Sequence, residues 1–324
     1  MTPLLEINDL RVYFDTPRGV VKAVDGVSFK VAPGETLAVV GESGCGKSVT
    51  CHSILRLHPS NGRIVAGSIS FQQVDLRSLD IPSLESYRGK EIAMIFQDPM
   101  TALNPVHTIG GQIAESIMLH RGMNRRDAFG AALRFLEIVG IPEAKRRLTE
   151  YPHQLSGGMN QRAMIAMALS CHPKLLIADE PTTALDVTIQ AQILELMRQL
   201  QREQGMAIIL ITHDLGVVAE MADNVAVMYS GKIVEQANVE DIFQRPAHPY
   251  TVALLESLPR IDRDLDKLRV IEGSVPSPFE LPRGCHFTPR CHFATEECRR
   301  RSPALEPLEA NHQAACLHPQ GIAP

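Results

Sequence analysis

One stretch decides the fold, and it reads Gly41-Glu42-Ser43-Gly44-Cys45-Gly46-Lys47-Ser48. The apolar run 36–40 before it predicts a buried strand, and residues 49–55 after it predict a helix. Glycines let backbone amides curve around an anion, and the start of the following helix adds positive partial charge. Strand, glycine-rich turn and helix in this order predict a phosphate-binding loop.

Two side chains of this loop have expected roles. The Lys47 ammonium supplies a charge for the β- and γ-phosphates of a nucleotide, and the Ser48 hydroxyl can bind Mg²⁺. The residues expected to contact the nucleotide here are Gly41, Ser43, Gly44, Cys45, Gly46, Lys47, Ser48 and Val49.

Length and composition limit the possibilities. With 324 residues, 44% of them hydrophobic, the chain suggests one large domain and a smaller one. Its 32 basic and 37 acidic residues give a net charge of -5, which offers no bulk attraction to nucleic acid. No apolar run reaches the roughly 20 residues of a membrane span, and the N-terminus lacks a secretion signal. We therefore expect a cytosolic protein whose seven cysteines are thiols or metal ligands.

Polar side chains follow three predicted strands. Gln97 comes after the apolar run that ends at Phe96, Asp179 and Glu180 follow run 175–178, and His213 follows run 207–211. Carboxyl ends of parallel strands form the ligand-binding edge of such a sheet. Asp179 can orient Mg²⁺, and Glu180 can polarise an attacking water. Taken singly, these side chains could equally be a strand-end amide, helix-capping acids and a structural histidine.

A second glycine-containing loop, at residues 155–159, opens onto another predicted helix. The hydroxyl of Ser156 and the amides of Gly157 and Gly158 form a second anion site at a helix N-terminus. One phosphate tail does not need both loops, so this one could serve a nucleotide held by another subunit. Before it, residues 106–150 have helical periodicity and predict a packed helical subdomain; the apolar positions are Ile109, Ile113, Ile117, Leu133, Leu136 and Ile138.

The first strands contain the aromatic residue that could stack on an adenine ring. Phe14 is the candidate, and Tyr13 lies on the opposite face of the same strand. From sequence alone, a core aromatic is the favoured interpretation of Phe14.

Four cysteines lie in the last 40 residues, spaced C-x5-C-x6-C-x17-C; they are Cys285, Cys291, Cys298 and Cys316. Four soft ligands in one short segment suggest a thiolate-bound metal, although the spacing fits neither the paired zinc pattern nor the ferredoxin runs. Scattered thiols are the alternative. His286 and His292 adjoin these cysteines and could replace one ligand.

Together these segments resemble the ATP-binding cassette (ABC) ATPases. The matching motifs are Walker A (41–48), the Q-loop (Gln97), the signature (155–159), Walker B (175–180), the D-loop (184–186) and the H-loop (His213). The signature departs from the usual pattern because Met159 stands where glutamine is common. The resemblance implies an α/β, P-loop nucleotide-binding domain with a parallel core sheet, an antiparallel β subdomain and a helical subdomain at about 98–165.

The resemblance also implies ATP and Mg²⁺ as cofactors and assigns roles. Ser48, Gln97 and Asp179 would organise Mg²⁺, Glu180 would be the general base, and His213 would contact the γ-phosphate. Phe14 would stack on adenine. Ser156, Gly157 and Gly158 would complete the site of a partner cassette.

Residues 97–105, 178–192 and 246–255 narrow the resemblance to dipeptide and oligopeptide importers, and most of all to their D-type ATPase subunits. This implies an ATPase domain over 1–245 and a C-terminal extension over 246–324 with a four-cysteine metal module. A 4Fe–4S cluster is the implied metal group, with zinc as the alternative.

The implied partners are a second, paralogous ATPase, two permeases and an extracytoplasmic peptide-binding protein, at the cytoplasmic face of the inner membrane. Nickel, glutathione or antimicrobial-peptide import, a non-transport ABC ATPase, and a stand-alone iron–sulfur protein with a vestigial ATPase remain alternatives.

Overall fold

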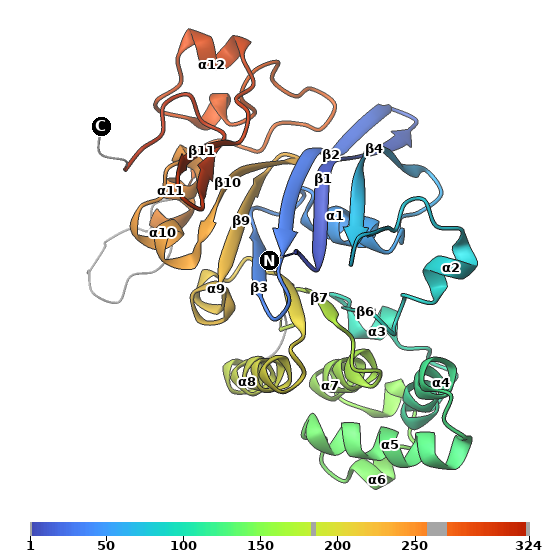
Figure 1. Ribbon diagram of the computed structural model, residues 1–324. Coiled ribbons are helices and arrows are strands. Elements are labelled where there is room, and N and C mark those ends of the chain that lie inside the picture. The colour runs from blue at the N-terminus through green and yellow to red at the C-terminus, as the bar shows by residue number, and fades with distance from the viewer. Residues whose placement is uncertain (1, 183–185, 258–270, 322–324) are drawn as a thin grey trace. The chain divides into compact units, whose positions relative to one another are not determined.

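The computed structural model describes residues 2–182, 186–257 and 271–321 (Figure 1). The chain forms two compact units. The first comprises residues 1–32, 36–78 and 212–324, and the second comprises residues 33–35 and 79–211.

An antiparallel sheet in the first unit has the strand order β2-β1-β4-β5. Its strands are β1 (Leu5–Thr16), β2 (Gly19–Val31), β4 (Gly62–Phe71) and β5 (Val74–Asp75). Along β1 the buried positions change register, from Leu5 and Ile7 to Leu10 and Val12. A bulge explains the change, because Asp9 has a φ of 46° and the pairing with β2 shifts between Ile7 and Leu10.

The first unit also contains a run of five strands. β3 (Thr36–Val40) pairs in parallel with β9 (Asn224–Tyr229), which pairs antiparallel with β10 (Lys232–Asn238). The last strands along the chain, β11 (Glu306–Glu309) and β12 (His312–Ala314), continue this sheet beyond β10. The helices of this unit are α1 (Lys47–Ile54), α9 (Leu215–Met221), α10 (Val239–Gln244), α11 (Pro249–Glu256) and α12 (Glu296–Arg300), with a 3₁₀ turn over Thr288–Arg290.

The second unit combines parallel strands with a group of helices. β6 (Ile92–Ile95), β7 (Leu175–Asp179) and β8 (Ala207–Ile211) are parallel and buried along their whole length. Figure 1 shows α4 (Ile109–Arg121), α5 (Arg125–Ile138) and α7 (Gly157–Leu169) packed together. The remaining helices are α2 (Ile81–Glu85), α3 (Pro99–Ala102), α6 (Ala144–Arg147) and α8 (Val187–Gln204), with a 3₁₀ turn over Pro152–Gln154.

Across the described ranges of both units, no helix combines the length and the hydropathy that crossing a bilayer demands.

Candidate nucleotide-binding and catalytic site

The phosphate loop, residues 41–48, joins the end of β3 to the start of α1, as predicted. Two of its glycines are required by their surroundings. A Cβ on Gly41 would lie 2.2 Å from the Met228 carbonyl oxygen, and one on Gly46 would lie 2.4 Å from that of Ala23. Both glycines also have positive φ, 149° and 104°. Only glycine satisfies both conditions, so the loop can adopt this path only with glycine at these positions.

Lys47 is buried, with its ammonium inside the loop. Its Nζ donates hydrogen bonds to the carbonyl oxygens of Gly41 at 2.7 Å and Glu42 at 3.0 Å. A positive charge and glycine-supported backbone at the N-terminus of a helix form an electropositive loop that suits phosphate.

In the second unit, the structure brings together two predicted catalytic residues. The Gln97 side-chain amide donates a hydrogen bond to the Glu180 carboxylate at 3.0 Å. Glu180 follows buried Asp179, the last residue of β7, and its backbone has a φ of 48°. A glutamate with positive φ is uncommon and is found chiefly where function or packing requires it. The carboxylate is therefore held at the end of the strand by its own backbone and by an amide.

His213 and Phe14 belong to the first unit. His213 is exposed in the turn before Asp214, whose carboxylate caps α9. Phe14 is half-buried and lies across from Gly62, where an added Cβ would come within 2.5 Å of the ring. On the opposite face, the Tyr13 hydroxyl donates to Asp25 at 2.8 Å. Tyr13 is thereby held by a polar partner, whereas Phe14 presents an apolar ring.

The second glycine loop opens the 13-residue helix α7, as predicted. Ser156 is its N-cap, and the hydroxyl accepts a hydrogen bond from the Met159 amide at 3.3 Å. Ser156 and Gly157 are exposed, so a ligand can reach this positive helix end. Of the expected D-loop, residues 184 and 185 lie outside the described residues, and Asp186 caps α8.

The four C-terminal cysteines line one small cavity with mainly apolar walls. Two of them have further polar neighbours: the His318 amide donates to the Cys316 sulfur at 3.3 Å, and the Thr295 hydroxyl lies 3.3 Å from the Cys298 sulfur. Over residues 2–182, 186–257 and 271–321, no group of three or more His, Cys, Asp or Glu has the arrangement of a metal site. The thiols therefore share a cavity, but a metal centre is not shown. Cys45, Cys51 and Cys171 are buried thiols.

His248 lines the same cavity, and its hydrogen bonds indicate what kind of group the cavity can hold. Its Nδ1 accepts the Tyr250 amide at 3.0 Å, so the imidazole proton is on Nε2. Burial lowers the pKa of His248 to about 3, which keeps the ring neutral. Within the described part of the chain, Nε2 is buried with no hydrogen-bond partner. Four soft thiols and one unsatisfied N–H fit a thiolate-bound metal group that also has hydrogen-bond acceptor atoms.

The sequence analysis missed two side chains that reach the phosphate loop from the C-terminal region. Arg290 contacts the Glu42 carboxylate at 2.6 Å, and the Tyr250 hydroxyl accepts the Glu42 amide at 2.9 Å. No local pattern signals either contact, because more than 200 residues separate the partners.

Comparisons with known proteins agree with this geometry. Residues 24–183 match the family model described as ABC transporter, and residues 234–298 match that of the oligopeptide/dipeptide transporter C-terminal region. The chain is 53% identical over 318 residues to the oligopeptide transport ATP-binding protein AppD of Bacillus subtilis, covering 98% of this chain and 97% of AppD.

Solved structures show the same fold. The dimeric ATP-binding cassette MJ0796, bound to ADP and Pi, superposes with a TM-score of 0.67 at 26% identity, over 72% of this chain and 98% of that one. CbiO1 from Clostridium perfringens, part of the ABC transporter complex CbiONQ, gives a TM-score of 0.62 at 26% identity, over 75% and 91%. The chain therefore belongs to the ATP-binding proteins of the oligopeptide/dipeptide group of ABC transporters.

Proposed function

We propose that this chain is the ATP-hydrolysing subunit of an ABC transporter that imports peptides. The observation that carries the proposal is an intact phosphate loop, with Lys47 buried inside it, in a chain that aligns end to end with an oligopeptide transport ATP-binding protein. The match to an oligopeptide transport ATP-binding protein over 98% of this chain favours peptides over nickel or glutathione as cargo.

The mechanism assigns one task to each residue. Lys47 and the loop amides would hold the phosphates, while Ser48, Gln97 and Asp179 would hold Mg²⁺, which would offset the negative charge of the phosphates. Glu180 accepts a proton from the water that attacks the γ-phosphorus, as the bond to the β–γ bridging oxygen breaks. Two further side chains complete the site: His213 contacts the γ-phosphate, and Phe14 stacks on adenine.

Replacing Glu180 with glutamine tests the base assignment. We expect turnover to fall by at least ~10²-fold, because general-base catalysis typically contributes that much. Glutamine keeps the shape of the side chain, so ATP affinity should stay within about twofold. Glu195→Gln, on an exposed part of α8, is the matched control. Wild-type hydrolysis by the Glu180 variant would rule out the assignment.

The exposure of Ser156 and Gly157 in the signature loop, residues 155–159, supports a dimer of two ATP-binding cassettes. Ser156, Gly157 and Gly158 lie at the exposed start of α7, and we propose that they close over the nucleotide of a second, paralogous ATPase. The assembly would lie at the cytoplasmic face of the inner membrane, with two permeases and an extracytoplasmic peptide-binding protein. The closer assignment is a D-type dipeptide-importer subunit. Co-purification with two polytopic proteins and a second ATPase supports this assembly, and a homodimer that hydrolyses ATP at full rate without them contradicts it.

We further propose that Cys285, Cys291, Cys298 and Cys316 hold a 4Fe–4S cluster, with zinc as the alternative. The shared cavity and the buried Nε2 of His248 support a thiophilic group. Such a group would cross-link four points of the C-terminal segment. Purified protein should contain about four irons per chain and absorb at about 400 nm, and Cys316→Ser should lose both signals. Cys171→Ser, at a buried thiol of the second unit, is the control. A colourless protein with one zinc per chain contradicts the iron assignment.

A further inference from the structure

Glu42, the second residue of the phosphate loop, is held on three sides. Its amide donates to the Tyr250 hydroxyl at 2.9 Å, and its carbonyl accepts from Lys47 Nζ at 3.0 Å. Its carboxylate accepts two bonds from Arg290, at 2.6 and 3.0 Å. Lys47 belongs to the loop itself, whereas Tyr250 and Arg290 lie in the region that matches the oligopeptide/dipeptide C-terminal family. Two separate contacts from that region therefore converge on one loop residue.

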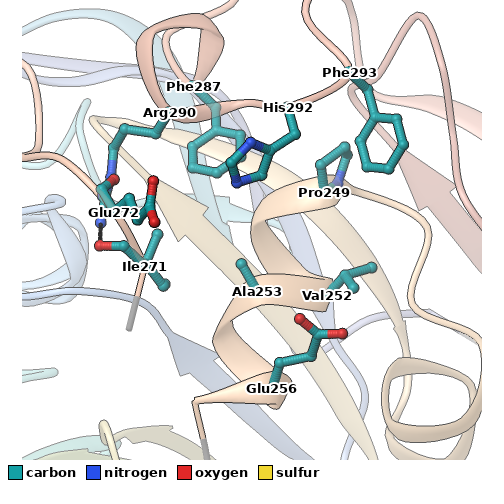
Figure 2. A pocket seen from close by; sticks show the side chains of 10 residues that line it. All are labelled: Pro249, Val252, Ala253, Glu256, Ile271, Glu272, Phe287, Arg290, His292 and Phe293. Atoms are coloured by element: carbon teal, nitrogen blue, oxygen red, sulfur yellow. Dashed lines mark hydrogen bonds between the residues drawn. The ribbon is translucent and has the colours of Figure 1, made fainter. Parts of the chain in front are cut away.

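Arg290 uses its whole guanidinium in this arrangement. Besides the two bonds to Glu42, its Nε donates to the Glu272 carbonyl at 3.0 Å and its Nη2 to the Ile271 carbonyl at 3.2 Å. Its Nη1 also approaches the Tyr229 hydroxyl at 3.4 Å. Five contacts match the five N–H donors of arginine, and the side chain is only 3% exposed. Figure 2 shows Arg290 at the wall of a pocket, beside Ile271 and Glu272.

The surroundings fix Tyr250 as firmly. Its ring lies 4.7 Å from that of Tyr229 and 5.5 Å from that of Phe287, and its side chain is fully buried. Phe287 is the N-cap of the 3₁₀ turn Thr288–Arg290, which ends at Arg290. One aromatic cluster thus supports both groups that contact Glu42.

Glu42 matters to the nucleotide because its peptide groups form part of the loop. Gly41 and Gly44, which flank this part of the loop, have positive φ. The Cys45 amide donates to the Glu42 carbonyl at 3.3 Å, and the side chains of Tyr250 and Lys47 add the contacts that hold the Glu42 peptide groups in place. The Glu42 carbonyl also accepts a hydrogen bond from the Lys47 ammonium, the group that would neutralise phosphate charge. A change in the orientation of this peptide would therefore move both the amides and the charge.

We propose that Arg290 and Tyr250 are positioning residues for ATP binding, through which the C-terminal extension sets the conformation of the phosphate loop at Glu42. The inference rests on the proposed ATP site at this loop. A bidentate, planar contact to a carboxylate is specific to arginine, so lysine cannot replace it.

The test uses the full chain and equilibrium dialysis with radiolabelled MgATP. We expect Arg290→Lys and Glu42→Gln each to raise the Kd for MgATP about tenfold, because each removes the bidentate charge-assisted contact. The double variant should be no more than about twofold weaker than either single variant, since both changes break the same link. In ATPase assays, KM should rise while kcat stays within about twofold, because Glu180 is unaffected. The Kd of Arg300→Lys, whose side chain is 78% exposed in α12, should not change.

Tyr250→Phe provides an independent arm, because it keeps the ring and removes only the acceptor for the Glu42 amide. We expect its Kd to rise several-fold without a change in kcat. If Arg290→Lys fails to fold, Glu42→Gln and Tyr250→Phe decide the matter. Wild-type Kd in these two variants, or multiplying effects in the Arg290–Glu42 pair, overturns the inference. Lys47→Ala distinguishes a failure of the proposed ATP site from a failure of this inference. If Lys47→Ala binds MgATP with wild-type affinity, the ATP site itself is wrong. If Lys47→Ala loses binding but Glu42→Gln keeps the wild-type Kd, only the positioning role is wrong.

Discussion

Replacing Glu235 with alanine should strongly destabilise the first unit. The Glu235 side chain, in β10, is fully buried. One carboxylate oxygen accepts the Ala247 amide at 2.7 Å and lies 2.8 Å from His312 Nε2, and the other accepts the His248 amide at 2.7 Å. A carboxylate only accepts, so His312 donates. The side chain thus ties β10, the start of α11 and β12 together.

The size of the effect follows from these contacts. A hydrogen bond to a charged group contributes about 1.5–3 kcal/mol net, and removing one partner of a buried pair costs about 3–5 kcal/mol. Alanine leaves three buried donors without their acceptor, so we expect a loss of about 4 kcal/mol in the free energy of unfolding. Glutamine keeps the shape and one accepting oxygen, and it should lose roughly half as much.

Urea unfolding followed by far-UV circular dichroism measures this loss. Glu309→Ala is the control, because its carboxylate is 43% exposed and pairs with Arg245 at the surface. Such an exposed pair should contribute no more than about 1 kcal/mol. The reasoning is refuted if Glu235→Ala loses no more than this control, or if Glu235→Gln is the less stable of the two Glu235 variants.

Three further changes test the loop, the helical group and the adenine assignment. Gly41→Ala should weaken MgATP binding at least about tenfold in equilibrium dialysis, because its Cβ would meet the Met228 carbonyl at 2.2 Å; normal binding contradicts the geometry of the loop. Thr108→Ala removes the N-cap of α4 and should cost about 1 kcal/mol in urea unfolding; an unchanged midpoint contradicts the cap. Phe14→Ala should weaken ATP about tenfold, as loss of base stacking typically does, while inorganic triphosphate competes as before; equal losses for both ligands contradict stacking.

Much of the fold follows from local pattern. The apolar runs predicted β3, β7 and β8 within a residue, because fully buried parallel strands have continuous hydrophobic sequence. Helical periodicity correctly placed Ile109, Ile113 and Ile117 on the buried face of α4. The same reasoning was wrong for Ile138, which is 48% exposed at the last residue of α5. An apolar side chain at the end of a helix can be exposed to solvent even where it follows the helical periodicity of the buried residues.

The contacts of the C-terminal region could not be predicted in this way. The phosphate loop has a pattern because local backbone geometry dictates its residues, whereas the contact of Arg290 with Glu42 depends on folding across 248 positions. Strands β11 and β12 were missed for a related reason. They are short and half-polar, and pairing with β10 defines them more than their own propensity does.

The place of β12 in the sheet has a consequence for biosynthesis. β10 cannot pair with β12 until residues 312–314 have left the ribosome. β3 cannot pair with β9 until the residues of the second unit, which lie between the two strands in sequence, have been synthesised. At translation rates of about 5–20 residues per second, the nascent first unit stays incomplete for on the order of ten seconds. During that interval its bare strand edges can pair with other nascent chains, so chaperones that shield such edges would raise the yield of this protein.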